Sequence, residues 1–137
     1  MAKDMNSSYV YHYYFDHALS FAEDIPMFHA EDLPFFFQSA SAMGLEFTAK
    51  EKNLIDIYSA YLANFIHYGD PNTISDEVKP KLANLNLVRW NPIDSRHLHT
   101  MVFSTTETVE CKIGIRQKQC DFLDDIGYYN VPNMNRK

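Results

Sequence analysis

The sequence is poor in several features that mark particular classes of protein. It has only two cysteines, Cys111 and Cys120, whose spacing fits neither a metal-binding finger nor a redox motif, and two are too few for a disulfide scaffold. We expect both to be buried thiols. The longest notable apolar block, residues 33–37, is far shorter than the roughly 20 residues that cross a bilayer. We therefore expect no membrane span.

Positive charge is scarce as well. The chain has 12 lysines and arginines against 18 aspartates and glutamates, which gives a net charge of -6, and the basic residues are scattered along it. This balance argues against nucleic acid as a partner. The amino end also lacks the apolar segment and cleavage site of a secretory signal. The localisation stays open, because it depends on whether Met1 is the true start of the protein.

Hydrophobic and aromatic residues are abundant, at 46% and 15%, which is typical of a globular domain with a dense core. Residues 9–15 place apolar or aromatic side chains in both alternating sets, as in a strand covered on both faces. We predict an interior strand of a largely parallel sheet there. Prolines and acidic residues break any period over 16–34, so we predict a long ordered loop, with a short helical turn over 32–38.

The clearest local signal is a helix start. Thr48 and Glu51 are spaced as a capping box, in which each side chain bonds the backbone amide of the other residue. Gly69, followed by Asp70 and Pro71, supplies the stop. Between them apolar residues recur at helical spacing and predict one broad buried stripe, made of Leu54, Ile55, Tyr58, Tyr61, Leu62, Phe65 and Ile66.

The carboxyl-terminal half is less regular. Residues 72–87 are polar and predict a surface connection, and alternation over 99–104 and 106–110 predicts two short strands with a turn at Thr105. Residues 113–126 carry apolar residues on one side and charged residues on the other, which predicts an amphipathic helix ending at Gly127. From residue 128 we expect a frayed tail.

Six histidines are the first candidates for chemistry. His12 lies within the aromatic strand, His17 follows it, and His67 lies in the last turn of the predicted helix. All three suit structural roles. His97 and His99 could share one face of a strand and chelate a metal, but their spacing indicates no third ligand, and zinc needs three or four. We therefore predict no metal site and no cofactor.

His29 differs because it lies in the loop after the predicted interior strand. Open α/β sheets place catalytic groups beyond the carboxyl ends of their strands. Two carboxylates follow at once, Glu31 and Asp32, and either could orient the ring or anchor the loop. The pattern does not say which.

Four blocks resemble type-B carboxylesterases and cholinesterases. Residues 29–37, His-Ala-Glu-Asp-Leu-Pro-Phe-Phe-Phe, are similar to the family's H-G-x-E-L-P-Y-V-F, and residues 61–72 are similar to its Y-W-x-N-F-A-x-x-G-D-P-N. Residues 90–93 resemble its W-P-x-Y turn, and residues 120–123 its C-x-F-W. The blocks occur in the family's order. The departures are Ala30 for a glycine, Asp32 for a glutamate, and Leu62 and Leu123 for tryptophans.

The resemblance implies an α/β fold, namely an incomplete C-terminal portion of an α/β hydrolase with sheet strands and packing helices. Residues 1–127 would be that portion of the carboxylesterase domain and 128–137 the tail, and His29 would be the catalytic base. The chain has no G-x-S-x-G nucleophile motif. The serine, the triad acid and the oxyanion-hole glycines would then lie in a missing N-terminal segment of the same fold, together with any disulfide partner of Cys120.

Three interpretations remain open at this point. In the first, the parent protein hydrolyses a small-molecule carboxylic ester with His29 as base, and this chain alone is inactive. In the second, the chain comes from a noncatalytic, adhesion-type relative that binds another protein with the same fold. In the third, it is an expressed remnant with no function of its own. A histidine kept in the right motif favours the enzyme.

Overall fold

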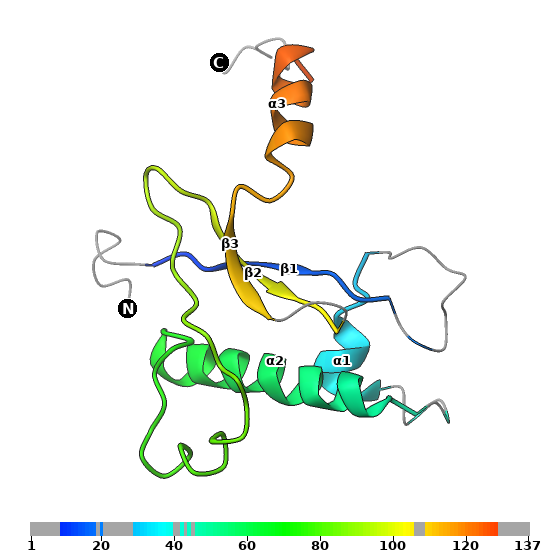
Figure 1. Cartoon of the computed structure of the whole chain (residues 1–137), viewed down its shortest axis with the longest axis vertical. Helices are drawn as coiled ribbons and strands as arrows, with labels where there is room; N and C mark the ends of the chain where they lie inside the picture. Colours follow the sequence, from blue (N-terminus) through cyan, green and yellow to red (C-terminus); the bar gives the residue numbers. More distant parts are fainter. Residues whose placement is uncertain are drawn as a thin grey trace, which may run out of the picture.

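The computed structural model describes residues 9–18, 20, 29–39, 42, 44, 46–105 and 109–128. Along the chain the elements are β1 (His12–Phe15), α1 (Leu33–Phe37), α2 (Ala49–Tyr68), β2 (His99–Phe103), β3 (Glu110–Ile113) and α3 (Gln117–Asp125). Figure 1 shows α1 and α2 on one side of a small sheet and α3, in orange, projecting away from it. None of the helices within the described ranges combines the length and the apolar character needed to span a membrane.

The sheet is mixed and three-stranded in the order β1-β2-β3. β1 runs parallel to β2, with His12 opposite Thr100 and Phe15 opposite Phe103, and β2 runs antiparallel to β3. The strand predicted over 9–15 begins only at His12, and it is an edge strand of the sheet that the described residues form, so the predicted interior position is wrong for that sheet. Residues before His12 have no strand to pair with, because β2 starts only at His99. The Val10 carbonyl accepts from the Ile93 amide of a loop instead.

α2 forms as its local signals predict. The Glu51 amide donates to Thr48 Oγ1 at 3.3 Å, and the Thr48 amide donates to Glu51 Oε2 at 2.7 Å. The helix ends at Gly69, whose φ of 72° is in the left-handed region and whose amide donates to the Phe65 carbonyl. The short helical turn predicted over 32–38 is also present, as α1.

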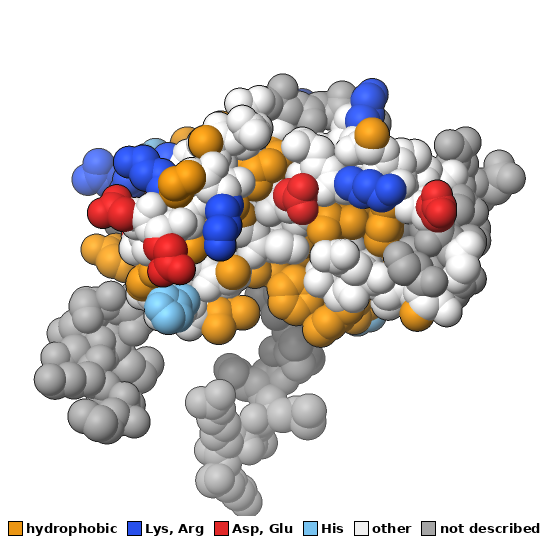
Figure 2. Space-filling model, turned by 90° about the horizontal axis from the view of Figure 1, so that it is seen from below, with side chains coloured by type: hydrophobic (Ala, Val, Ile, Leu, Met, Phe, Trp, Pro, Cys, Tyr) orange, Lys and Arg blue, Asp and Glu red, His pale blue; other side chains and the backbone are white. Residues whose placement is uncertain are grey.

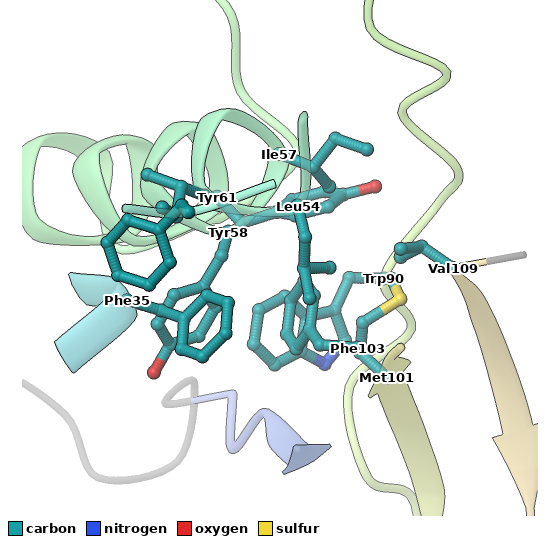
Figure 3. Close-up of a cluster of buried hydrophobic side chains, with 11 residues drawn as sticks. Phe35, Leu54, Ile57, Tyr58, Tyr61, Trp90, Met101, Phe103 and Val109 are labelled. Atoms are coloured by element: carbon teal, nitrogen blue, oxygen red, sulfur yellow. The ribbon is translucent and has the colours of Figure 1, made fainter. Parts of the chain in front are cut away.

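The core lies between α2 and the sheet. Figure 3 shows Tyr58, Tyr61 and Leu54 of α2 turned toward Phe103 of β2 and Trp90 of the preceding loop. These side chains are almost fully buried. Of the predicted stripe, Ile66 is exposed at 75%, and Phe65 is still 42% exposed although its ring packs edge-on against Tyr11.

The carboxyl-terminal predictions need correction. The second short strand, predicted over 106–110, instead runs from Glu110 to Ile113 as β3, because antiparallel pairing places these residues opposite Val102 to His99. Residues 106–108 lie outside the described ranges. α3 begins at Gln117 and not at 113, since the strand comes first and Gly114 and Arg116 then take positive φ.

No residue of α3 is buried, so its apolar side faces solvent. Its one cysteine, Cys120, is therefore an exposed free thiol, and the prediction of a buried thiol is wrong there. Cys111 on β3 is half-buried and also free. Of the predicted tail only Tyr128 is described, and it is exposed.

Candidate active site

His29 lies in a turn that joins the loop after β1 to α1. The Leu33 amide donates to the Ala30 carbonyl, and the Phe36 amide donates to the Asp32 carbonyl, so the turn leads directly into the helix. The His29 side chain is exposed, and it makes no hydrogen bond within the described part of the chain. With Tyr13 and Phe15 of β1 it lines an open cavity of about 470 Å³.

Asp32 anchors this turn to the core. Its Oδ2 accepts from the Tyr13 hydroxyl at 2.6 Å, and the single Tyr58 hydroxyl proton is shared between Asp32 Oδ2 at 3.2 Å and the Tyr13 oxygen at 3.1 Å. Burial raises the pKa of both tyrosines, so they stay protonated donors at neutral pH. The sequence left open whether a carboxylate here orients the His29 ring or anchors the loop. Asp32 anchors the loop. Glu31 is buried beside it, at 4% exposure.

Ala30 has a φ of 70°, in the left-handed region that disfavours residues with a Cβ atom. Such a conformation costs roughly 1–2 kcal/mol for a residue other than glycine. This is the position at which the resembled family has a glycine. The turn is therefore strained between the candidate base His29 and its anchor Asp32.

A second buried polar cluster joins the end of β1 to the start of α2. Glu51 is fully buried and its Oε1 lies 3.0 Å from His17 Nε2, while Ser20 Oγ donates to Glu51 Oε2 at 2.8 Å. The other His17 nitrogen, Nδ1, lies 2.7 Å from Thr105 Oγ1. Desolvation would raise the pKa of Glu51, but hydrogen bonds from His17, Ser20 and Thr48 outweigh it and lower the pKa to about 2.

The cluster is not a nucleophile triad, although it contains a serine, a histidine and an acid. In a triad the histidine lies between the serine and the acid, whereas here the Glu51 carboxylate lies between Ser20 and His17. Both His17 ring nitrogens are occupied. Sequence reasoning missed the cluster because its members lie far apart in the chain; only the Thr48 and Glu51 pair was readable from local spacing.

The remaining histidines lie away from His29. His12 is exposed, and its Nδ1 is 2.9 Å from Thr100 Oγ1 of the neighbouring strand. His67 is exposed in the last turn of α2, with its ring against Tyr68. His97 and His99 lie at the amino ends of β1 and β2, opposite the carboxyl end from which the His29 loop departs.

The face seen from below in Figure 2, which is the α2 side of the molecule, carries lysine and arginine side chains interspersed with acidic ones. Hydrophobic side chains show between them, and no basic patch gathers on this face. This is the mixed surface that the scattered charge in the sequence predicts.

The sequence matches a model of the carboxylesterase family over residues 1–123. The chain belongs to this family. Solved structures agree in fold: an esterase from Clostridium hathewayi, described as able to hydrolyse aliphatic aromatic polyesters, superposes with a TM-score of 0.65 at 16% identity over 85% of this chain. A thermophilic pNB esterase gives 0.60 at 19% identity over 84%, and a Geobacillus stearothermophilus carboxylesterase gives 0.55 at 21% over 81%.

This carboxylesterase-family chain spans only about a fifth of those structures, between 21% and 22% of their length. A search of curated proteins found no match. The predicted fold class, a portion of an α/β hydrolase with strands and packing helices, is confirmed by these structures. The assignment of His29 as the base stays a prediction.

Proposed function

We propose that this chain is the segment of a carboxylic-ester hydrolase that carries the histidine base, His29. Family membership supports the reaction class. The choice of His29 as the base is supported by its position, in a loop after a strand that runs parallel to its neighbour. The serine nucleophile, the triad acid and the oxyanion hole would be supplied by the missing N-terminal segment of the same fold.

One observation carries the proposal. The His29 ring is exposed beside an open cavity and makes no hydrogen bond within the described ranges, while its turn is held by Asp32. A general base needs a fixed backbone and a ring nitrogen that can reach the reacting proton. His17 is the contrasting case, because Glu51 and Thr105 occupy both of its nitrogens.

In the complete hydrolase the base would act twice. As a serine oxygen attacks the ester carbonyl, His29 takes the hydroxyl proton, and it then gives that proton to the departing alkoxide, which leaves as the alcohol. A water molecule repeats the sequence on the acyl-enzyme: His29 takes its proton, the acid is released, and the proton returns to the serine. The substrate would be a small-molecule carboxylic ester.

The test uses the protein that contains this chain together with the segment encoded upstream. His29→Gln should lower the turnover of a p-nitrophenyl ester by several orders of magnitude, because the serine is no longer activated. His12→Gln is the matched control, since it removes an exposed histidine that bonds only Thr100, and its specific activity should stay within a modest factor. Near-normal activity of a folded His29→Gln protein would refute the assignment.

The chain by itself gives the complementary test. A base without a nucleophile has nothing to activate, so the purified 137-residue chain should not hydrolyse aryl esters faster than its own His29→Gln variant. Serine-dependent turnover by the purified chain would show a small enzyme of a different kind.

A further inference from the structure

Three metal-ligating side chains converge at the amino ends of β1 and β2. Asp94 lies in the loop before β2, and His99 is the first residue of that strand. Asp94 Oδ2 lies 3.2 Å from His97 Nδ1 and 3.6 Å from His99 Nε2. Each of the three residues offers one ligand atom, and these atoms all lie within 4.8 Å of one another.

The loop holds the Asp94 carboxylate in place for this arrangement. Its Oδ1 accepts from the backbone amides of Arg96 at 2.7 Å and His97 at 2.8 Å, and the Asp94 amide donates to the His97 carbonyl. Those bonds use one carboxylate oxygen and leave the other, Oδ2, facing the two imidazoles.

We propose that Asp94 Oδ2, His97 Nδ1 and His99 Nε2 form a binding site for a divalent transition-metal ion of the Zn²⁺ type, with solvent completing the coordination. The Asp94 and His97 side chains are about half exposed, at 50% and 47%, so an ion can reach the site. His99 is held more firmly, with 16% of its side chain exposed.

The spacing and the chemistry of the ligands both favour such an ion. Zinc binds imidazole nitrogen and carboxylate oxygen at about 2.0–2.2 Å, which puts ligand atoms about 3.3 Å apart around a tetrahedral centre. The separations of 3.2 and 3.6 Å fit that value. Calcium and magnesium prefer sites made of oxygen alone, which two imidazoles do not provide.

A bound ion would tie the loop to the strand. Asp94 and His97 belong to the connection that leads into β2, and His99 belongs to the sheet itself. Because the ion would bind the arrangement in the folded chain, which the unfolded chain lacks, it should raise thermal stability, and the gain should grow with the logarithm of its free concentration above the dissociation constant. The site lies at the opposite end of β1 from the His29 loop, so it does not depend on the proposed hydrolase activity.

The experiment must remove other zinc ligands first. The chain is prepared without an affinity tag and with Cys111→Ser and Cys120→Ser, because both thiols are free. ZnCl₂ is titrated into it by isothermal calorimetry, and CoCl₂ by visible absorption. We expect one equivalent of Zn²⁺ to bind, and Co²⁺ to give a d–d spectrum of low coordination number.

The variants separate the ligands from the loop. His97→Ala and His99→Ala should each weaken Zn²⁺ binding at least about tenfold, since loss even of a residue that only orients a ligand costs that much. Asp94→Asn keeps an oxygen for the Arg96 and His97 amides but loses the anionic ligand, so it should weaken binding while the loop stays folded. His67→Ala removes an exposed histidine far along α2 and should bind as the parent does.

Binding that is absent in the thiol-free chain, or unchanged in His97→Ala and His99→Ala, would overturn the proposal. Circular dichroism shows whether each variant is folded. If one is not, histidine ring resonances of the unsubstituted chain decide: stoichiometric Zn²⁺ should shift those of His97 and His99 and leave those of His12 and His67 in place. Shifts at the other two histidines instead would refute the site.

Discussion

The two longer helices share an amphipathic sequence pattern but differ completely in what they contact. α2 buries eight of its residues and is capped at both ends, by the Thr48 box and by Gly69. α3 buries none, has no side-chain cap, and starts after Arg116 in a left-handed conformation. Arg116, the residue before α3, bonds the sheet, because its guanidinium donates to the Tyr14 hydroxyl of β1.

The difference shows that an apolar stripe predicts a helix face but not the presence of a partner for it. Phe122 and Ile126 of α3 are 60% and 58% exposed, whereas Leu54 and Tyr58 of α2 are 2% exposed. The chain spans about a fifth of the length of the esterase structures that share its fold, and no residue of α3 is buried. α2 carries the stability of the piece, and four experiments test that division.

Removal of the Glu51 side chain should have the largest effect. Glu51→Ala leaves His17, Ser20 and Thr48 without their buried partner, and breaking such a buried charged group costs about 3–5 kcal/mol. The free energy of unfolding is measured by urea titration with circular dichroism. The control in α3 is Asp121→Ala, which removes an exposed acceptor of Gln117 and should change stability by less than about 0.5 kcal/mol. Equal losses would remove the contrast between the helices.

The pH dependence of stability should follow from the same carboxylate. In the folded chain the pKa of Glu51 is about 2, below its ordinary 4.5, so folding favours the ionised form. Its stabilisation is therefore complete above pH 4.5 and is lost as the pH falls toward 2. At about 1.4 kcal/mol per pKa unit, the loss is on the order of 3 kcal/mol. The slope in this window should be clearly shallower in Glu51→Gln; an equally steep slope would assign it to other groups.

Relief of the strained turn should give a smaller change, in the opposite direction. Ala30→Gly removes the Cβ atom from a residue with a φ of 70° and should raise the free energy of unfolding by up to about 1 kcal/mol, after the greater entropy of glycine in the unfolded chain is subtracted. Arg116→Gly, at a φ of 60° before α3, should gain less because it loses the bond to Tyr14. A destabilised Ala30→Gly chain would show that the Ala30 methyl group contributes packing.

The smallest change in stability should come from the exposed face of α3. Phe122→Ser should alter the free energy of unfolding by less than about 0.5 kcal/mol, whereas Leu54→Ala in α2 should cost about 2–5 kcal/mol. Self-association is a separate readout, because β1 is also an edge strand of the sheet that the described residues form. Sedimentation should show less association for Phe122→Ser than for the parent. A large loss of stability would mean that α3 packs in solution.

Elements fixed by neighbouring residues were predictable, and those fixed by distant ones were not. The capping box at Thr48 and Glu51, and the stop at Gly69, lie within one turn of the helix ends, so spacing alone located α2. β3 was misplaced because its register is set by β2 and not by its own alternation. The edge position of β1 likewise depends on which other strands are present.

The same distinction applies to the candidate sites. His29 was predicted from its motif and stays a prediction, whereas the anchoring role of Asp32 depends on Tyr13 and Tyr58, which lie 19 and 26 residues away. Alternation along a strand brings His97 and His99 together but not Asp94, because Asp94 reaches the two histidines from a loop turn. The spacing of an Asx turn before a strand would have been the signal to look for.

The position of the one tryptophan gives the chain an internal optical probe. Trp90 is 3% exposed, its Nε1 donates to the His12 carbonyl of β1, and its ring lies edge-on to Tyr13 and Tyr61. An indole in that apolar setting emits at shorter wavelength than one in water. Its emission therefore reports, without any attached dye, whether the strand that leads to His29 is docked against α2, and rapid mixing would time that docking.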